Sequence, residues 1–370
     1  MACRNLIGSL YNVMNRNLET KNLFRKFLMP TLALLAGFSV GFMLRGLIPE
    51  KSKPQVFEIR QGGWKYINPL LECERGQNVL SDPELRPMRE HVEKFIRENV
   101  KQRWGDEVSI YFRELNDGLA FSIGKDSQFY PASLLKVPDM ISVLKKAETS
   151  PQLLTKRIAY NNPDLKSYQN TDVADKLSFG RSYTVEDLLK RTIDYSDNVS
   201  SLLLEEAINK IDLRKTYDDL GIPDPYYLND ESGYMLSVEL YASFFRVLFN
   251  ASYLNREMSE KALEYLAKTD YTKGLAAGVP PKIAVAHKFG LRKINGIKQL
   301  HDCGIVYYPD HPYLLCVMTS GPVPEYLDTT IAEISGFIYE EIDRQHRSNE
   351  PVSKLSFPSC FHVDHLGEHS

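Results

Sequence analysis

The sequence has little that favours a metal site, a disulfide framework or a nucleic-acid surface. It contains five cysteines among 370 residues and no Cys-x-x-Cys pair, so neither a zinc site nor a disulfide framework is indicated. Its formal net charge is -3 at pH 7, which leaves no excess positive charge for a nucleic-acid partner. It also lacks a repeat of about 20–50 residues, which excludes solenoids and propellers.

Two of the cysteines lie on neighbouring strand-like segments. Cys303 and Cys316 flank a turn that the sequence places at Asp310–His311. Counted back from that turn, the two cysteines are not opposite each other. No disulfide between them is therefore predicted.

Near the N-terminus, the segment "FLMPTLALLAGFSVGFML" from Phe27 to Leu44 has 18 residues without a charge, which is long enough for a short membrane span. The residues before it carry more positive than negative charge, which places residues 1–26 in the cytoplasm and the chain after Gly46 outside. A cleaved signal peptide is the alternative, but no small-x-small cleavage site follows the apolar run. We expect residues 27–48 to be an uncleaved, single-pass anchor in the cytoplasmic membrane.

The rest of the chain divides into a linker, one globular domain and a tail. Residues 49–56 ("PEKSKPQV") are polar and proline-containing, which is typical of a linker, and the globular domain is expected over residues 57–345. Residues 346–370 have no apolar periodicity and indicate a flexible tail. Cys360 and the histidines of this tail match no structural zinc spacing, so no metal site is predicted.

Apolar periodicity predicts an α+β domain with helices covering one antiparallel sheet. The expected order is a helix over 86–100, strands over 107–115 and 118–125, a mainly helical middle over 132–268, strands over 283–290, 302–309 and 313–321, and a helix over 330–342. Strands at both ends of the domain predict that the two chain ends meet in the sheet.

The stretch "FYPASLLKVP" (129–138) contains a serine three positions before a lysine, Ser133 and Lys136. Residues three apart share a helix face, so the lysine amine can lie beside the serine hydroxyl. A partly desolvated amine has a lowered pKa and can accept the serine proton. The alternative is an ordinary first-turn helix serine, and this stretch alone does not decide between the two.

Two further segments carry polar residues in a suggestive order. Thr184 and Asp187 form a capping-box pattern that predicts a helix through Tyr195. "SDN" (196–198) then interrupts the apolar pattern; helix capping explains one of these three residues but not all of them. The third segment is "HKFG" (287–290), at the end of a predicted strand, where His287 is expected to be structural.

Ser-x-x-Lys, Ser-Asp-Asn and Lys-x-Gly in this order resemble the penicillin-recognising serine hydrolases, and most closely their class A β-lactamase branch. The flanking segments "YTVEDLLKRTIDYSDN" and "GLAAGVPPKIAVAHKFG" are also similar to that family. The resemblance covers residues 85–343. It implies a β-lactamase/transpeptidase-like fold and a substrate that is a β-lactam or a peptidoglycan stem peptide, with no metal or organic cofactor.

Carried over position by position, the resemblance implies a role for each motif residue. Ser133 attacks the carbonyl carbon and forms an acyl-enzyme, and Lys136 accepts the serine proton. Ser196 relays a proton to the leaving amine, and Asn198 holds the amide side chain of the substrate. Lys288 supplies positive charge for the substrate carboxylate and tunes Ser196.

The resemblance also implies that the substrate lies along residues 289–291. Backbone N–H groups of Ser133 and Leu291 would form the oxyanion hole, beside Gly290. Here the chain departs from the family, which has Thr or Ser where this sequence has Phe289. A phenyl ring cannot donate a hydrogen bond to a substrate carboxylate. Arg292 is one residue that could take over this contact.

A second departure concerns the base that would hydrolyse the acyl-enzyme. The family carries a glutamate four positions before an asparagine on a long loop, whereas here Pro225 stands four positions before Asn229. The acids in this loop are Asp224, Asp230 and Glu231. None is in register, so a long-lived acyl-enzyme, as in penicillin-binding peptidases, is one expectation.

Three functions are compatible with these motifs. The first is a membrane-anchored serine hydrolase that opens a β-lactam ring or a D-alanyl peptide outside the cytoplasm, as a β-lactamase or a D-Ala-D-Ala carboxypeptidase does. The second is a catalytically degenerate receptor that binds cell-wall fragments or β-lactams without turnover, motivated by Phe289 and the short loop. The third is a structural membrane protein with accidental motifs. The presence of all five motif residues favours the enzyme.

Overall fold

The computed structural model describes residues 60–70, 85–101, 107–116, 118–170, 175–208, 210–223, 234–294 and 296–348. The predicted segments 1–26, 27–48 and 49–56 lie outside these residues, as does the chain after residue 348. Among the described residues, no helix combines the length and the apolar character that a membrane crossing needs.

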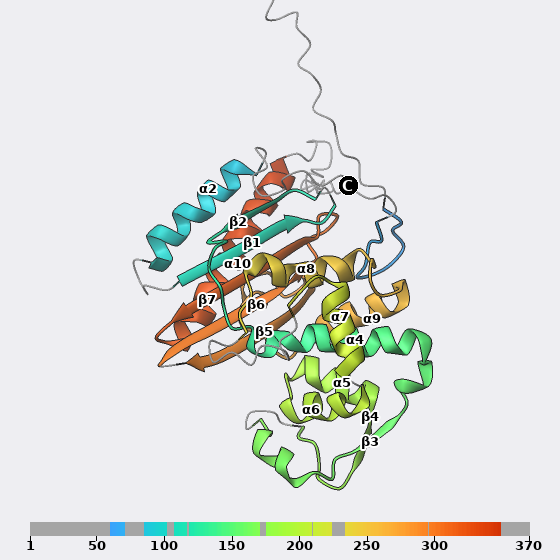
Figure 1. Cartoon of the computed structure of the whole chain (residues 1–370). Helices are drawn as coiled ribbons and strands as arrows, with labels where there is room; N and C mark the ends of the chain where they lie inside the picture. The colour runs from blue at the N-terminus through green and yellow to red at the C-terminus, as the bar shows by residue number, and fades with distance from the viewer. Residues whose placement is uncertain are drawn as a thin grey trace, which may run out of the picture. The chain divides into compact units, whose positions relative to one another are not determined.

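Strands from both ends of the described chain form one five-stranded sheet in the order β2-β1-β7-β6-β5 (Figure 1). Their bounds are β1 (Glu107–Glu114), β2 (Ala120–Ile123), β5 (Val285–Ile294), β6 (Ile297–Val306) and β7 (Tyr313–Gly321). All neighbouring pairs are antiparallel. The N-terminal strand β1 pairs with the C-terminal strand β7, so the predicted α+β sheet built from both chain ends is confirmed.

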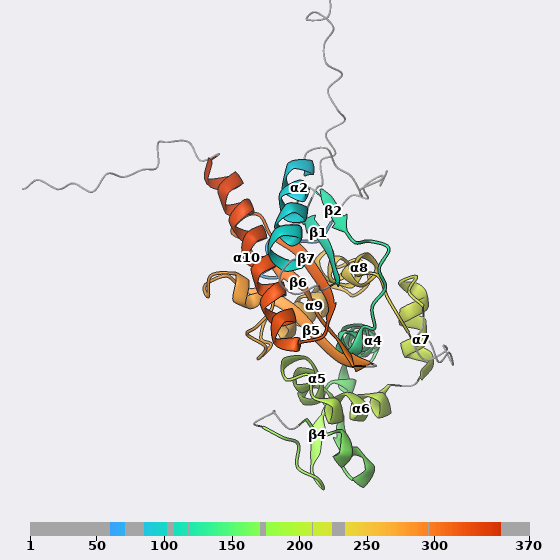
Figure 2. The same cartoon turned by 90° about the vertical axis from the view of Figure 1, so that its left-hand side faces the viewer.

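Side chains that alternate along β7 pack into two separate cores, because successive residues of a strand point to opposite faces. Leu315 and Val317 belong to the core beneath α2 (Arg86–Phe95) and α10 (Pro324–Ser348). Leu314 and Met318 belong to the larger core of the other face. In Figure 2, α2 and α10 lie on one side of the sheet and α8 lies on the other.

Helices of the middle segment fill the larger core. They are α4 (Lys136–Thr149), α5 (Val185–Asp194), α6 (Asn198–Ala207), α7 (Lys210–Asp219), α8 (Val238–Phe249) and α9 (Arg256–Leu266). The predicted capping box is present at the start of α5, where the Asp187 N–H donates to Thr184 Oγ1 at 3.0 Å.

One small element of this middle segment was not predicted from the sequence. Strands β3 (Arg157–Ala159) and β4 (Ser182–Thr184) form a two-stranded sheet. Each strand has three residues, which is too short for a period of two to be visible in the sequence.

The expectation that Cys303 and Cys316 do not form a bridge is wrong. The two cysteines are direct partners in the β6–β7 register and form a disulfide. The pairing of Val306 with Tyr313 centres the turn between Pro309 and Asp310, earlier than the position assumed from the sequence. Because register follows the turn, this small displacement brings the two cysteines opposite each other.

Candidate active site

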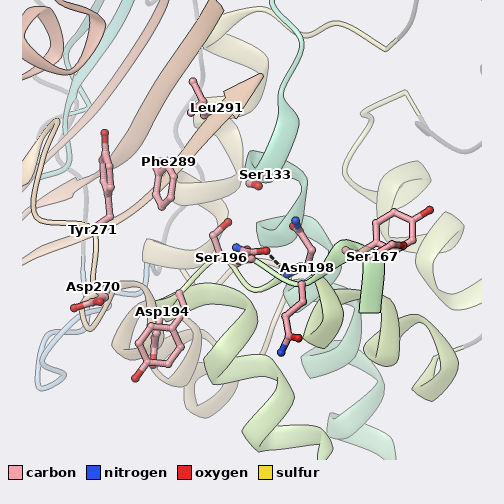
Figure 3. Close-up of a pocket in the computed structure, with 13 residues that line it drawn as sticks. Ser133, Ser167, Asp194, Ser196, Asn198, Asp270, Tyr271, Phe289 and Leu291 are labelled. Carbon is pink, nitrogen blue, oxygen red and sulfur yellow. Dashed lines mark hydrogen bonds between the residues drawn. The ribbon is translucent and has the colours of Figure 1, made fainter. Parts of the chain in front are cut away.

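A pocket of about 650 Å³ opens where the helical middle segment meets the edge strand β5 (Figure 3). The residues that line it come from segments far apart in the sequence: Ser133, Ser167, Tyr168, Gln169, Asn170, Asp194, Tyr195, Ser196, Asn198, Asp270, Tyr271, Phe289 and Leu291. Five of the residues singled out from the sequence are among them: Ser133, Ser196, Asn198, Phe289 and Leu291.

Ser133 lies in a 3₁₀ helix (Ala132–Leu135) that runs directly into α4. The preceding residue, Ala132, has a φ of 50°, a left-handed conformation that side-chain-bearing residues rarely adopt. Such backbone strain persists where the surrounding structure imposes it, often at functional sites. Among the described residues, the Ser133 hydroxyl has no hydrogen-bond partner, so it is available to a ligand in the pocket.

The Lys136 amine lies one turn further along and is buried. Its Nζ donates to Ser196 O at 2.6 Å, to Ser196 Oγ at 3.1 Å and to Asn198 Oδ1 at 2.7 Å. Burial lowers the pKa of Lys136 to about 8, against the opposing effect of the Asp197 and Asp139 carboxylates. A lysine in this state can give up and take back a proton near neutral pH.

Each member of the Ser-Asp-Asn turn has a distinct contact. Asp197 caps α6, since its carboxylate accepts from the Val199 N–H at 3.1 Å and from Ser200 Oγ at 2.6 Å. Ser196 has a φ of 53°, another left-handed residue. Asp197 is thus the residue of this turn that caps α6. Ser196 and Asn198 line the pocket and accept hydrogen bonds from Lys136.

Lys288 lies beneath the pocket and is not one of its lining residues. Its side chain is fully buried, its Nζ donates to Phe289 O at 3.1 Å, and it lies 4.2 Å from the centroid of the Phe289 ring. Burial lowers the pKa of Lys288 well below its ordinary value, and the nearby Lys136 lowers it further, while Asp302 and Asp194 oppose both effects. This amine is therefore enclosed by protein rather than presented to solvent.

Gly290 allows β5 to approach the segment that carries Ser133. A Cβ atom at this position would lie 2.6 Å from Pro131 O and 3.0 Å from Leu134 Cγ. Only glycine fits such a close approach without displacing backbone. The glycine thus brings Phe289 and Leu291 to the same pocket as Ser133.

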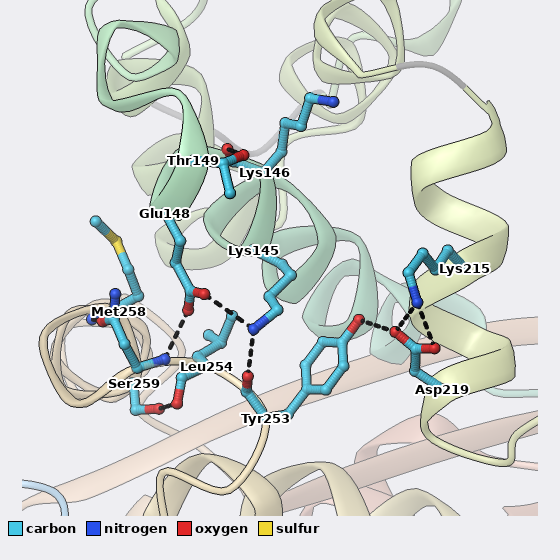
Figure 4. A network of polar contacts seen from close by, with 11 residues as sticks. Lys145, Lys146, Glu148, Thr149, Lys215, Asp219, Tyr253, Leu254, Met258 and Ser259 are labelled. Carbon is cyan, nitrogen blue, oxygen red and sulfur yellow. Dashed lines mark hydrogen bonds and ion pairs between the residues drawn. The ribbon is translucent and has the colours of Figure 1, made fainter.

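A polar network fixes the far end of α4 (Figure 4). Glu148 accepts from the Asn255 N–H at 2.6 Å and from Lys145 Nζ at 2.9 Å. Lys145 also donates to Tyr253 O at 2.7 Å, and the Tyr253 hydroxyl donates to Asp219 at 3.0 Å. These contacts join α4 to α7 and to the loop before α9, so the helix that carries Lys136 is held at its C-terminal end.

Several pocket residues were not found from the sequence. Asn170 donates to Ser196 O at 3.1 Å and accepts from the Asn198 N–H at 3.4 Å, so it supports the Ser-Asp-Asn turn. Asp194, Asp270 and Tyr271 also line the pocket. Asp194 stands two positions before the Ser-Asp-Asn motif, which is the one sequence signal that could have drawn attention to it.

Other sequence expectations have varied outcomes. His287 is buried and its Nδ1 lies 2.9 Å from Asp302 Oδ1, contacts that are consistent with the expected structural role. Arg292 packs over the ring of Tyr130 at 4.7 Å and does not line the pocket. The acids considered for deacylation lie outside the described residues: Asp224, Asp230 and Glu231.

This α+β fold, with a serine, a lysine and a Ser-x-Asn turn meeting at one pocket, defines a serine hydrolase of the penicillin-recognising class. The chain belongs to the Beta-lactamase enzyme family, whose family model matches residues 91–342. The sequence matches none of the curated proteins with which it was compared.

Solved structures share the fold at low sequence identity. A β-lactamase from Chitinophaga pinensis is 19% identical, with a TM-score of 0.61 over 70% of this chain and 100% of that one. PBP-A is 20% identical, with a TM-score of 0.56 over 70% of this chain and 97% of that one. A class A β-lactamase from Mycobacterium abscessus is 19% identical, with a TM-score of 0.57 over 69% and 98% of the two chains.

The close approach at Gly290 predicts that Gly290→Ala destabilises the protein. The added methyl group would collide with Pro131 O, so we expect a loss of about 1–3 kcal/mol in the free energy of unfolding, measured by urea denaturation. Leu291→Ala is the control, because that side chain is 51% exposed and its removal leaves no cavity. Equal stability of the two variants would contradict the prediction.

The network at the end of α4 predicts a loss of stability in Glu148→Ala. This change leaves the Asn255 N–H without its acceptor and Lys145 with only Tyr253 O, so we expect a loss of about 1–3 kcal/mol in the free energy of unfolding. Lys215→Ala removes an exposed ion pair with Asp219 and should cost less than about 1 kcal/mol. If the Lys215 variant were the less stable one in chemical denaturation, the network would not be what holds this helix end.

Proposed function

We propose that this protein is a membrane-anchored serine hydrolase that cleaves an amide through an acyl-Ser133 intermediate. The observation that carries the proposal is the Lys136 amine, which is buried beside the pocket and bonded to Ser196 and Asn198. The substrate class that follows from the family is a β-lactam ring or a D-alanyl peptide. The acyl-enzyme complex of a PBP-A mutant with penicillin G is one example in a structure of the same fold.

Acylation requires one proton to move from the nucleophile to the leaving group. Neutral Lys136 accepts the Ser133 proton as Oγ attacks the carbonyl carbon and the C–O bond forms. Ser196, whose Oγ lies 3.1 Å from Lys136 Nζ, gives its proton to the leaving amine as the C–N bond breaks and takes up the proton that Lys136 received from Ser133. Asn198 lies beside the same lysine and offers its amide to the acyl group of the substrate.

The reaction is proposed to occur outside the cytoplasm, with residues 27–48 as the anchor. The charge distribution around that segment supports this orientation. The Cys303–Cys316 disulfide also supports it, because disulfides persist in oxidising compartments and are rare in the cytosol of most organisms.

A receptor that is acylated but does not turn over is the second proposal. Phe289 supports it, because a ring occupies the position from which the family donates a hydrogen bond to the substrate. In that case the acyl group would stay on Ser133, and no product would be released.

Fluorescent penicillin and a chromogenic cephalosporin test both proposals. We expect the fluorescent label on the Ser133 peptide and slow release of hydrolysed cephalosporin, with labelling reduced at least about a thousandfold in Ser133→Ala. Ser252→Ala, which removes an exposed hydroxyl after α8, is the control. Stable labelling without any product would favour the receptor, and unchanged labelling of Ser133→Ala would exclude Ser133 as the nucleophile.

The pKa of Lys136 predicts how acylation depends on pH. The amine is active when neutral, so the acylation rate should rise with pH and level off above about pH 8. Burial raises the pKa of Asp139 itself to about 8, and its ionised form raises the pKa of Lys136, so Asp139→Asn should move the midpoint of the rise to lower pH. Stopped-flow measurements of acylation from about pH 5 to about pH 10 give the midpoints for the natural sequence and for Asp139→Asn. A rate that falls over the same interval would rule out Lys136 as the base.

A further inference from the structure

One wall of the pocket is not used by the proposed reaction. It consists of Asp194, Asp270, Tyr271 and Phe289, and we call it the acid–aromatic wall. In Figure 3 the two aspartates lie below Tyr271 and Phe289, on the side of the pocket away from Ser167. This wall adjoins the Lys-x-Gly strand, against which the family places the carboxylate of its substrates.

The wall offers no positive charge to a carboxylate. Among the described residues that line the pocket, two are aspartates and none is a lysine, arginine or histidine. Lys288, the residue that the family resemblance assigns to the carboxylate, is fully buried and its amine is covered by the Phe289 ring. The Phe289 ring stacks on Tyr271, with a centroid distance of 4.0 Å and an interplanar angle of 19°. An anionic group here would therefore meet aromatic carbon and two carboxylates.

The two aspartates are linked, and neither forms an ion pair within the described chain. The Asp270 N–H donates to Asp194 O at 2.9 Å, which holds the two residues together. Asp194 Oδ1 is buried without a hydrogen-bond partner among the described residues. Two lysines near Asp194 are paired elsewhere: Lys190 lies 3.6 Å from Glu186, and Lys268 lies 2.6 Å from Glu264.

Burial raises the pKa of Asp194 to about 6, and the neighbouring Asp270 acts in the same direction, while Lys268, Lys190 and Lys288 oppose it. The Asp194 carboxylate, which is partly desolvated, is thus largely negative at neutral pH. A cation that enters the pocket beside it would be attracted by this charge.

Buried polar contacts hold the acid–aromatic wall in place before any ligand binds. Asp302 accepts from the Leu275 N–H at 2.9 Å and pairs with His287. Gly274, whose added Cβ would lie 2.5 Å from Asp302 Oδ2, lets the loop reach this carboxylate. The Tyr271 hydroxyl donates to Asp328 on α10, which fixes the ring against Phe289. A preformed wall loses little entropy on binding.

We propose that the acid–aromatic wall selects substrates with an ammonium group where the family's usual substrates carry a carboxylate. Charge attraction to Asp194 and Asp270 and the exposed part of the Tyr271 ring both favour such a cation. This inference rests on the proposed acyl-Ser133 chemistry. It assigns Asp194, Asp270 and Phe289 to the specificity for the leaving group.

Three thioesters that share one N-acyl-D-alanyl group distinguish a preference for a cationic leaving group from acylation of Ser133 itself. Their leaving thiols are thiocholine, mercaptopropionate and the uncharged tert-butyl analogue of thiocholine. In each, Ser133 Oγ forms a bond to the carbonyl carbon, the C–S bond breaks, and the serine proton passes through Lys136 to the thiolate. A chromogenic disulfide reports the released thiol, and mass spectrometry of the intact protein reports the acyl group on Ser133.

For the natural sequence we expect kcat/KM for the thiocholine ester to exceed that for the mercaptopropionate ester at least about tenfold. Asp270→Asn and Asp194→Asn should each reduce this ratio about three- to tenfold. Phe289→Thr should lower the ratio by raising kcat/KM for the mercaptopropionate ester. The value of kcat/KM for the uncharged ester shows how far each variant changes acylation itself.

Glu90→Gln is the matched control, because it removes one negative charge from an exposed position on α2. Its ratio should stay within about twofold of that of the natural sequence. The ammonium inference would be overturned if kcat/KM were higher for the mercaptopropionate ester than for the thiocholine ester, or if Asp270→Asn and Glu90→Gln gave equal ratios. Acylation of Ser133 in the same experiment would still support the proposed function. If none of the three esters acylated Ser133, the proposed function and the inference would both fail.

Discussion

The Lys136 amine is the point at which the two halves of the active site are joined. It is carried by α4, yet its hydrogen-bond acceptors belong to the Ser-Asp-Asn turn between α5 and α6. A buried ammonium without acceptors would be costly, so these three bonds set the distance between the serine-bearing helix and that turn. The same burial lowers the pKa of Lys136, so the contact that positions the site also prepares the amine that we propose as the base.

Strained backbone surrounds this contact. Ala132, which precedes Ser133, and Ser196, in the turn, both adopt left-handed conformations that favour glycine. Each such residue costs on the order of 1–3 kcal/mol and is maintained by its surroundings. Those surroundings include the Asp197 cap of α6 and the close approach of β5 at Gly290.

The acid–aromatic wall differs from the family pattern, whereas the motif that contains Ser133 matches it. Phe289 replaces a hydroxyl donor and covers Lys288, and the loop anchored by Asp302 brings Asp270 and Tyr271 to the same side. Asp270 and Tyr271 lie in the loop between α9 and β5, which carries none of the proposed acyl-transfer residues. Selection of the leaving group can therefore change in this loop without loss of those residues.

The sequence by itself determined the order of the helices and of the strands of the main sheet, the capping box of α5 and the three motifs, because these depend on residues close together in the chain. It did not predict the β6–β7 disulfide, since a turn placed one position late moves the partner of Cys303. Nor did it find Asp270, Tyr271 or Asn170, which carry no local pattern. Only the tertiary structure decided that these residues share a pocket with Ser133, and that Lys288 lies buried beneath it. Both depend on packing between segments far apart in the chain, which no local sequence pattern records.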